Sequence, residues 1–217
     1  MSRFGEFFAR GRSALLNGQA TYDRPPVEGA SRWGAAAVLR PSGPVLDRLV
    51  ELAGELRPVV GAGHWVHGAD ALHVTLRSLE PYREDVTDRR VYGAALEEAM
   101  RGLPPVRVEL RGVAGHHGGV LVWATPADET LATLQKRFAH ALGEKGAFES
   151  WTRDIWYVSL VHFAAPVERP EAIVGWCEER ADLPVGVAEL SRAEIVRAVH
   201  AGGGVRLVTL ERAECGP

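Results

Sequence analysis

Two short segments of the chain pair a polar ring with a hydroxyl two residues further on. The first is His-Val-Thr-Leu at residues 73–76, and the second is Tyr-Val-Ser-Leu at residues 157–160. Each alternates polar and apolar side chains, as a half-buried strand does, so the ring and the hydroxyl share one face. Imidazole exchanges protons near neutral pH because its pKa is about 6.5. The two segments therefore indicate acid/base chemistry, provided that their polar faces line one cleft.

The two segments occupy matching places in a repeated order of elements. Hydrophobic periodicity predicts the order β-α-β-α-β twice, with corresponding elements 83 to 84 residues apart. The predicted strands cover residues 33–40, 72–79, 106–113, 120–124, 156–163, 185–190, 194–199 and 205–210, and the predicted helices cover 45–56, 86–100, 127–142 and 170–179. This order predicts a duplicated α/β (α+β) domain, with two antiparallel sheets around a central cleft and the helices outside.

The repeat sets the expected domain organisation. We expect one bilobal domain over residues 32–213, with lobes at about 32–113 and 119–213. Residues 1–31 form an N-terminal extension in which apolar side chains predict a short amphipathic helix; they are Phe4, Phe7, Phe8, Leu15 and Leu16. Three roles for this helix stay open: packing back on the domain, covering the cleft, or binding a partner.

The composition limits the classes of function. The chain has 217 residues, 46% of them hydrophobic, with a net charge of −3 and a pI near 6.3. This balance excludes nucleic-acid or membrane binding driven by bulk charge. The chain has no apolar run long enough for a transmembrane helix. Because only Cys177 and Cys215 are present and neither is placed for a structural disulfide, we expect a cytoplasmic protein, which we take to be a monomer.

The pair of motifs resembles the two-histidine (2H) phosphoesterase superfamily, which includes 2′-5′ RNA ligase-like proteins and 2′,3′-cyclic nucleotide phosphodiesterases. The signature of that group is H-x-[TS]-x, with x apolar, occurring twice, and the resemblance spans about residues 32–210. It implies hydrolysis of a phosphodiester by acid/base catalysis, without metal or cofactor. The implied substrate is a small nucleotide-like or phosphorylated molecule, or an RNA end. The first acid/base role falls to His73, and phosphate binding to Thr75 and Ser159.

This sequence departs from the signature at one position, where Tyr157 replaces the second histidine. A phenol has a pKa of about 10 and is a poor base near neutral pH. We hypothesise that His73 is the base and that Tyr157 is the acid or a phosphate donor; loss of one acid/base group costs roughly 10²–10⁴ in rate. Two alternatives stay open: a protein that binds the phosphorylated ligand without turning it over, and an enzyme repurposed to another reaction in the same cleft.

Further candidates follow from strand parity and aromatic character. Arg77 has the same parity as His73 and Thr75, so two alternatives stay open for it: pairing with a phosphate, or lying on the surface without a ligand. The stacking candidates are Trp65, Tyr82, Trp123 and Trp156, while Trp33 is expected to pack the first strand.

The remaining histidines are weaker candidates. His116 lies in a glycine-rich turn from which it could overhang the cleft. His162 is five residues after Tyr157, so parity predicts that it faces away from the cleft unless a bulge intervenes. His64 and His67 have a metal-like spacing, but no cysteine or acidic residue completes a ligand set, so we expect no metal.

Overall fold

The computed structural model describes residues 3–216, which form five α-helices, one short 3₁₀ helix and nine strands. The helices are α1 (Arg3–Leu16), α2 (Gly43–Val60), α3 (Arg89–Met100), α4 (Thr130–Leu142), η1 (Gly143–Gly146) and α5 (Pro170–Glu178). The strands are β1 (Ala36–Leu39), β2 (Trp65–Val66), β3 (Val74–Ser78), β4 (Val106–His116), β5 (Gly119–Pro126), β6 (Trp156–His162), β7 (Pro184–Leu190), β8 (Arg192–Ala201) and β9 (Gly204–Glu214).

The strands form one curled sheet in the order β7-β4-β5-β6-β3-β1-β8-β9, with β2 paired to β6. Every pairing in it is antiparallel, so the predicted mixed fold with antiparallel strands is confirmed. The two predicted sheets are joined at the centre, where Val74 of β3 pairs with Val158 of β6. The motif strands are therefore neighbours.

The halves of the sheet do not coincide with the halves of the sequence. β4 follows the first motif in the chain but pairs with β5, and β8 follows the second motif but pairs with β1. On either side of the central β6–β3 pair, β5 takes the place that β1 takes on the other side, and β4 takes the place of β8. The order is therefore that of two repeats, each of which places its third strand, β4 or β8, in the sheet half of the other repeat. Each spatial half thus contains strands from both of the predicted lobes, 32–113 and 119–213.

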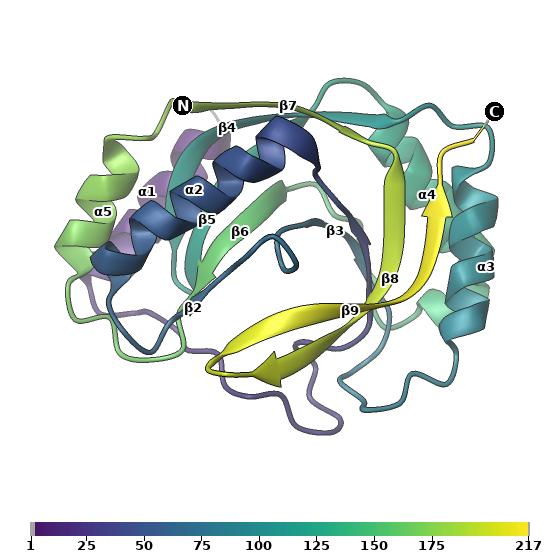
Figure 1. The fold of residues 1–217 in the computed structure, drawn as a ribbon, viewed down its shortest axis with the longest axis horizontal. Helices are drawn as coiled ribbons and strands as arrows, with labels where there is room; N and C mark the ends of the chain where they lie inside the picture. Colours follow the sequence, from purple (N-terminus) through teal and green to yellow (C-terminus); the bar gives the residue numbers. More distant parts are fainter. Residues whose placement is uncertain (1–2, 217) are drawn as a thin grey trace.

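The helices cover the outside of the curled sheet on two sides. α1, α2 and α5 lie on one side and α3 and α4 on the other, while the β8–β9 hairpin curls across the open side toward β2 (Figure 1). None of the helices formed by residues 3–216 has the length and apolar character that a bilayer crossing requires.

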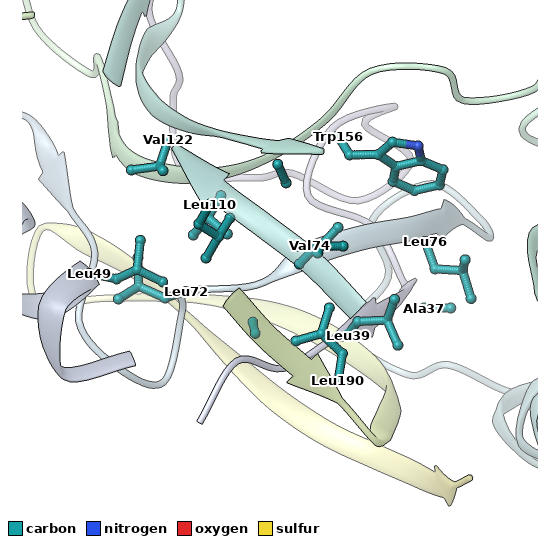
Figure 2. Packing of buried hydrophobic residues seen from close by; sticks show 14 of the residues in the cluster. Ala37, Leu39, Leu49, Leu72, Val74, Leu76, Leu110, Val122, Trp156 and Leu190 are labelled. Atoms are coloured by element: carbon teal, nitrogen blue, oxygen red, sulfur yellow. The ribbon is translucent and has the colours of Figure 1, made fainter. Parts of the chain in front are cut away.

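The apolar positions of the two motifs anchor both strands in the core. Val74, Leu76, Val158 and Leu160 are all at most 1% exposed. Figure 2 shows Val74 and Leu76 within the buried cluster that also holds Trp156. Because side chains alternate along a strand, burial of these residues turns the motif ring and hydroxyl toward the opposite, concave face.

Both motif strands contain a one-residue bulge at the same place. Between β1 and β3, the partners of Ala37 and Val38 are Arg77 and Thr75, so Leu76 is the extra residue. Between β5 and β6, the partners skip from Val161 to Ser159, so Leu160 is the extra residue. A bulge reverses the alternation beyond it. The residues that return to the concave face are therefore Ser78 and His162, themselves 84 positions apart.

The N-terminal helix packs back on the domain. Leu15 of α1 is 1% exposed, and Phe4 and Phe7 pack on Trp123 with ring centroids 5.4 and 5.5 Å apart. Trp123 is paired with Tyr157 across β5 and β6, so the two phenylalanines cover the position next to the second motif. Of the three roles left open for this helix, the structure shows packing on the domain.

We predict that Gly11→Ala detaches α1. A Cβ at Gly11 would lie 1.9 Å from the carbonyl oxygen of Gly115 in β4, so the helix must move away. The free energy of unfolding, measured by urea denaturation, should fall by about 1–3 kcal/mol. The matched control is Gly54→Ala in α2, where no atom lies within 4 Å of the added Cβ and stability should rise by about 0.5–1 kcal/mol. Equal gains in both variants would contradict the close contact.

Candidate active site

Four side chains predicted from the motifs line one cleft of about 230 Å³ on the concave face: His73, Thr75, Tyr157 and Ser159. The antiparallel pairing of Val74 with Val158 sets their relative positions. In this register His73 lies beside Ser159, and Thr75 lies beside Tyr157. The cleft therefore has an imidazole end and a phenol end, each with a hydroxyl from the other strand.

The hydrogen bonds of His73 fix its tautomer. Its Nδ1 lies 2.6 Å from the carbonyl oxygen of Ala71, which only accepts, so Nδ1 carries the proton. Its Nε2 lies 3.1 Å from Oγ1 of Thr75, so the hydroxyl donates to the bare nitrogen. The pKa of His73 is lowered to about 4, chiefly by burial, against the opposing hydrogen bond to Ala71 and with smaller contributions from Arg40 and Arg153. At neutral pH, Nε2 is therefore an unprotonated base that faces the cleft.

A guanidinium stands at the phenol end. Arg153 lines the cleft and donates from one terminal nitrogen to Oγ of Ser78 (3.2 Å) and to Oε2 of Glu149 (2.6 Å). Glu149 is 2% exposed and also accepts from the backbone N–H of Ser78 (3.0 Å). Arg153 precedes β6 in an irregular segment, and Ser78 reaches the cleft only through the bulge. Sequence periodicity could therefore have found neither.

The predicted orientation of His162 is wrong, because the bulge at Leu160 turns this side chain into the cleft. Its Nδ1 lies 2.6 Å from Nε2 of His67, which is 6% exposed. The ring of Trp33 packs edge-on against His162 at 4.8 Å. Trp33 has a φ of 65°, a conformation unfavourable for a bulky residue, and it lines the cleft as well as packing on Trp65.

The prediction that Arg77 shares the face of His73 is also wrong. The bulge at Leu76 reverses its direction, and the residue is 8% exposed. Its guanidinium donates to the carbonyl oxygens of Gly146 (2.7 Å) and Glu149. Arg77 thus fixes the segment that carries Glu149 rather than reaching a ligand.

The structure does not bring the remaining substrate-binding candidates to the cleft. Trp65 is 4% exposed in a small cluster with Ala198 and Val205. Trp156 lies on the core face of β6, and the ring of His116 packs against Phe7.

Tyr82 lies beyond the end of β3, where its backbone bonds to Gly29 and Ala30, and its side chain is not among those that line the cleft. Among residues 3–216, no group of three or more His, Cys, Asp or Glu side chains is placed to hold a metal ion.

We predict that the protein loses stability between about pH 6.5 and pH 4. Burial lowers the pKa of His67 and His116 to about 3 and that of His73 to about 4, and the pKa of His162 is also lowered. In this window the unfolded chain binds protons that the folded protein does not, so the free energy of unfolding falls as the pH falls. The slope is up to about 1.4 kcal/mol per pH unit for each histidine.

Urea unfolding at a series of pH values measures this slope. His116→Gln should make it shallower, whereas His140→Gln, at an exposed position on α4, should leave it unchanged. A stability that is flat from about pH 6.5 to pH 5, above the usual range of carboxylates, would show that these imidazoles are not held neutral.

The family relationship follows from a match of the sequence to a family model. The model of the 2′-5′ RNA ligase superfamily matches residues 46–198, which include both motifs. The chain belongs to this superfamily. The resemblance to 2H phosphoesterases drawn from the motif pair is thereby confirmed. Among curated proteins, none matches the chain significantly.

Several solved structures have a similar fold. TT0787 of Thermus thermophilus has a TM-score of 0.62 at 19% identity, over 83% of this chain and 97% of that one. LigT of E. coli in its apo form has a TM-score of 0.58 at 14% identity, over 88% of this chain and 98% of LigT. LigT has also been solved with 3′-AMP, at a TM-score of 0.56, 14% identity and the same coverage. At these low sequence identities, the structural similarity establishes the fold of this chain and nothing more.

Proposed function

We propose that this protein hydrolyses a nucleotide or RNA-like phosphodiester, of the 2′,3′-cyclic or 2′-5′ type, by acid/base catalysis. The observation that carries the proposal is the state of His73. Its bare Nε2 faces the cleft because Nδ1 is committed to the carbonyl of Ala71. An imidazole held in this tautomer is ready to take a proton from water.

The proposed reaction uses both ends of the cleft. Nε2 of His73 accepts a proton from the attacking water, and the Tyr157 hydroxyl protonates the departing ribose oxygen. Thr75, whose hydroxyl donates to His73 in this structure, turns to a non-bridging phosphate oxygen when substrate binds, as does Ser159. These donors and the Arg153 guanidinium oppose the negative charge that develops on the phosphate oxygens. Position 157 matters because an in-line displacement needs its acid on the side opposite the base.

The size and charge of the molecule favour a small substrate. The cleft of about 230 Å³ suits one phosphodiester group with part of a nucleotide, and the net charge of −3 disfavours long RNA. The LigT structures with 3′-AMP, NADP⁺ and ATP each contain a nucleotide phosphate.

We propose a small nucleotide or an RNA end as the substrate and a monomer as the active unit. A cytoplasmic location is consistent with the free thiols of Cys177 and Cys215.

One observation favours a second function, in which the protein binds a phosphorylated ligand without turnover. Tyr157 lies across the cleft from His73, and a phenol is a weaker participant in proton transfer near neutral pH than an imidazole. The binding groups of the cleft do not depend on this position, since Thr75, Ser159 and Arg153 line it as well.

The test offers the purified protein 2′,3′-cyclic AMP and a 2′-5′-linked diadenosine monophosphate, with the products followed by chromatography and the binding of 3′-AMP by calorimetry. The proposal expects turnover of at least one substrate and competition by 3′-AMP. Binding of 3′-AMP without turnover would replace the enzyme by the ligand-binding function. Neither binding nor turnover would favour a repurposed cleft and contradict both.

A further inference from the structure

A pair of imidazoles, His67 and His162, lies at the His73 end of the cleft and has no part in the proposed reaction. His162 lines the cleft, and His67 lies behind it with 2.6 Å between His67 Nε2 and His162 Nδ1. In the β6 register His162 follows Ser159, which is beside His73. His162 therefore lies on the same side of a bound phosphorus as His73. It cannot replace the acid that an in-line displacement needs at the opposite end.

The titratable groups that act on His162 all favour its neutral form. They come from each element around it: His67 after β2, His73 before β3, His116 at the end of β4, and Arg32 before β1. Arg32 is already paired with Asp23 at 2.7 Å. Burial is the main reason that the pKa of His162 lies well below its usual value. None of the other groups that shift this pKa is a carboxylate, so none of them opposes the effect of burial. Asp23 is occupied by Arg32, and Glu80 lines the cleft but is not among the groups that act on His162.

We infer that His162, backed by His67, is a proton-linked anchor for the phosphate group of the ligand. This inference rests on the proposed function for the presence of a phosphate. A proton from solvent adds to His162 when the anion enters, and the imidazolium then has an N–H on both nitrogens. Nδ1–H donates to Nε2 of neutral His67, which leaves Nε2–H of His162 to donate to a phosphate oxygen. The arriving anion compensates the buried charge that is otherwise unfavourable.

The hydrogen bond between His67 and His162 gives His67 a role in the anchor. An imidazolium buried without an acceptor for its second N–H would leave a donor unsatisfied, and His67 supplies that acceptor at a fixed position. The ring of Trp33 packs nearly perpendicular to that of His162, with centroids 4.8 Å apart, which limits rotation of the imidazole. His67 and Trp33 are therefore positioning residues, and His162 is the group that contacts the ligand.

Sulfate is a suitable probe, because it is a tetrahedral dianion that takes up no proton itself near neutral pH. Long-range ¹H–¹⁵N NMR of the imidazoles at about pH 7 reports whether each ring nitrogen carries a proton. Without sulfate, His162 should show one protonated nitrogen. With saturating sulfate, at constant ionic strength, it should show two. The His162→Gln variant assigns the signals, and the exposed His140 is the internal control.

The affinity gives an independent readout. With one linked proton, the affinity of the wild type for sulfate should rise about tenfold for each unit of pH lowered between about pH 8 and pH 6. In His162→Gln this dependence should disappear, while His73→Gln should keep it. Protonation of His73 in place of His162, a pH-independent affinity, or an equal dependence in His162→Gln would overturn the inference.

The outcome does not depend on turnover. If no nucleotide is hydrolysed but His162 takes up a proton from solvent when sulfate binds, the proposed function fails and the anchor stands. If a cyclic nucleotide is hydrolysed while His162 stays neutral in saturating sulfate, the anchor fails and the proposed function stands.

Discussion

Replacing Tyr157 with histidine is expected to raise kcat/KM for a 2′,3′-cyclic nucleotide by roughly 10²–10⁴. An imidazole, whose ordinary pKa of about 6.5 is close to neutral pH, would stand at the phenol end of the cleft, beside Thr75 and across from His73. A proton donor matched to neutral pH makes departure of the ribose oxygen easier than a phenol does. Initial rates at several substrate concentrations measure the change.

The matched control for this substitution is Tyr22→His, which makes the same chemical change at an exposed position that does not line the cleft. It should leave kcat/KM unchanged. Tyr157→Phe, which keeps the ring and removes the hydroxyl, should lower the rate of the wild type. A folded Tyr157→His protein with no gain in rate would contradict the position assigned to this side chain.

The second large effect is expected for His73→Gln, which should lower kcat/KM by roughly 10²–10⁴ with little change in the affinity for 3′-AMP. A glutamine amide can still donate to the carbonyl of Ala71, but it has no basic nitrogen to accept the proton of water. Measurement of kcat and of 3′-AMP binding separates loss of chemistry from loss of the site. His140→Gln is the control for a histidine outside the cleft.

The pH profile of the wild type adds a signature to this prediction. Because the pKa of His73 is lowered to about 4, its base form persists below the usual range of histidine. The acid limb of kcat/KM should therefore lie near pH 4 to 5 rather than near 6.5. A midpoint near 6.5 that is absent in His73→Gln would show that His73 is solvated and not buried as described.

The sequence predicted the motif strands well because their signal is local. Alternation of His73 and Thr75 with Val74 and Leu76 needs only the two-residue period of a strand, and burial of the apolar pair confirms it. The spacing of 84 residues to the second motif also reflects the real correspondence of β3 with β6.

What the sequence could not predict lies beyond the bulges. Parity assigns Arg77 to the cleft and His162 away from it, and both assignments fail for the same reason, since Leu76 and Leu160 each insert one residue. A bulge has no reliable signature in a single sequence because the inserted residue is itself apolar and buried. The repetition of the error at matching positions shows that the bulge belongs to the duplicated unit.

The sequence also did not predict which strands pair with each other in the sheet. The order of elements suggested two lobes of consecutive residues, but β4 and β8 are exchanged between the halves of the sheet. Hydrophobic periodicity identifies strands without naming their partners. Arg153 was missed because it lies in an irregular segment, where only the contacts of Glu149 and Ser78 show its direction.

The most direct test of the account is a double-mutant cycle at positions 73 and 157. The values of kcat/KM for a 2′,3′-cyclic nucleotide are measured for the wild type, His73→Gln, Tyr157→His and the double variant. If both side chains act on one phosphorus, the gain from Tyr157→His should largely vanish when the base at position 73 is absent. The same gain in both backgrounds would mean that the two groups act independently, and would contradict a shared reaction centre in this cleft.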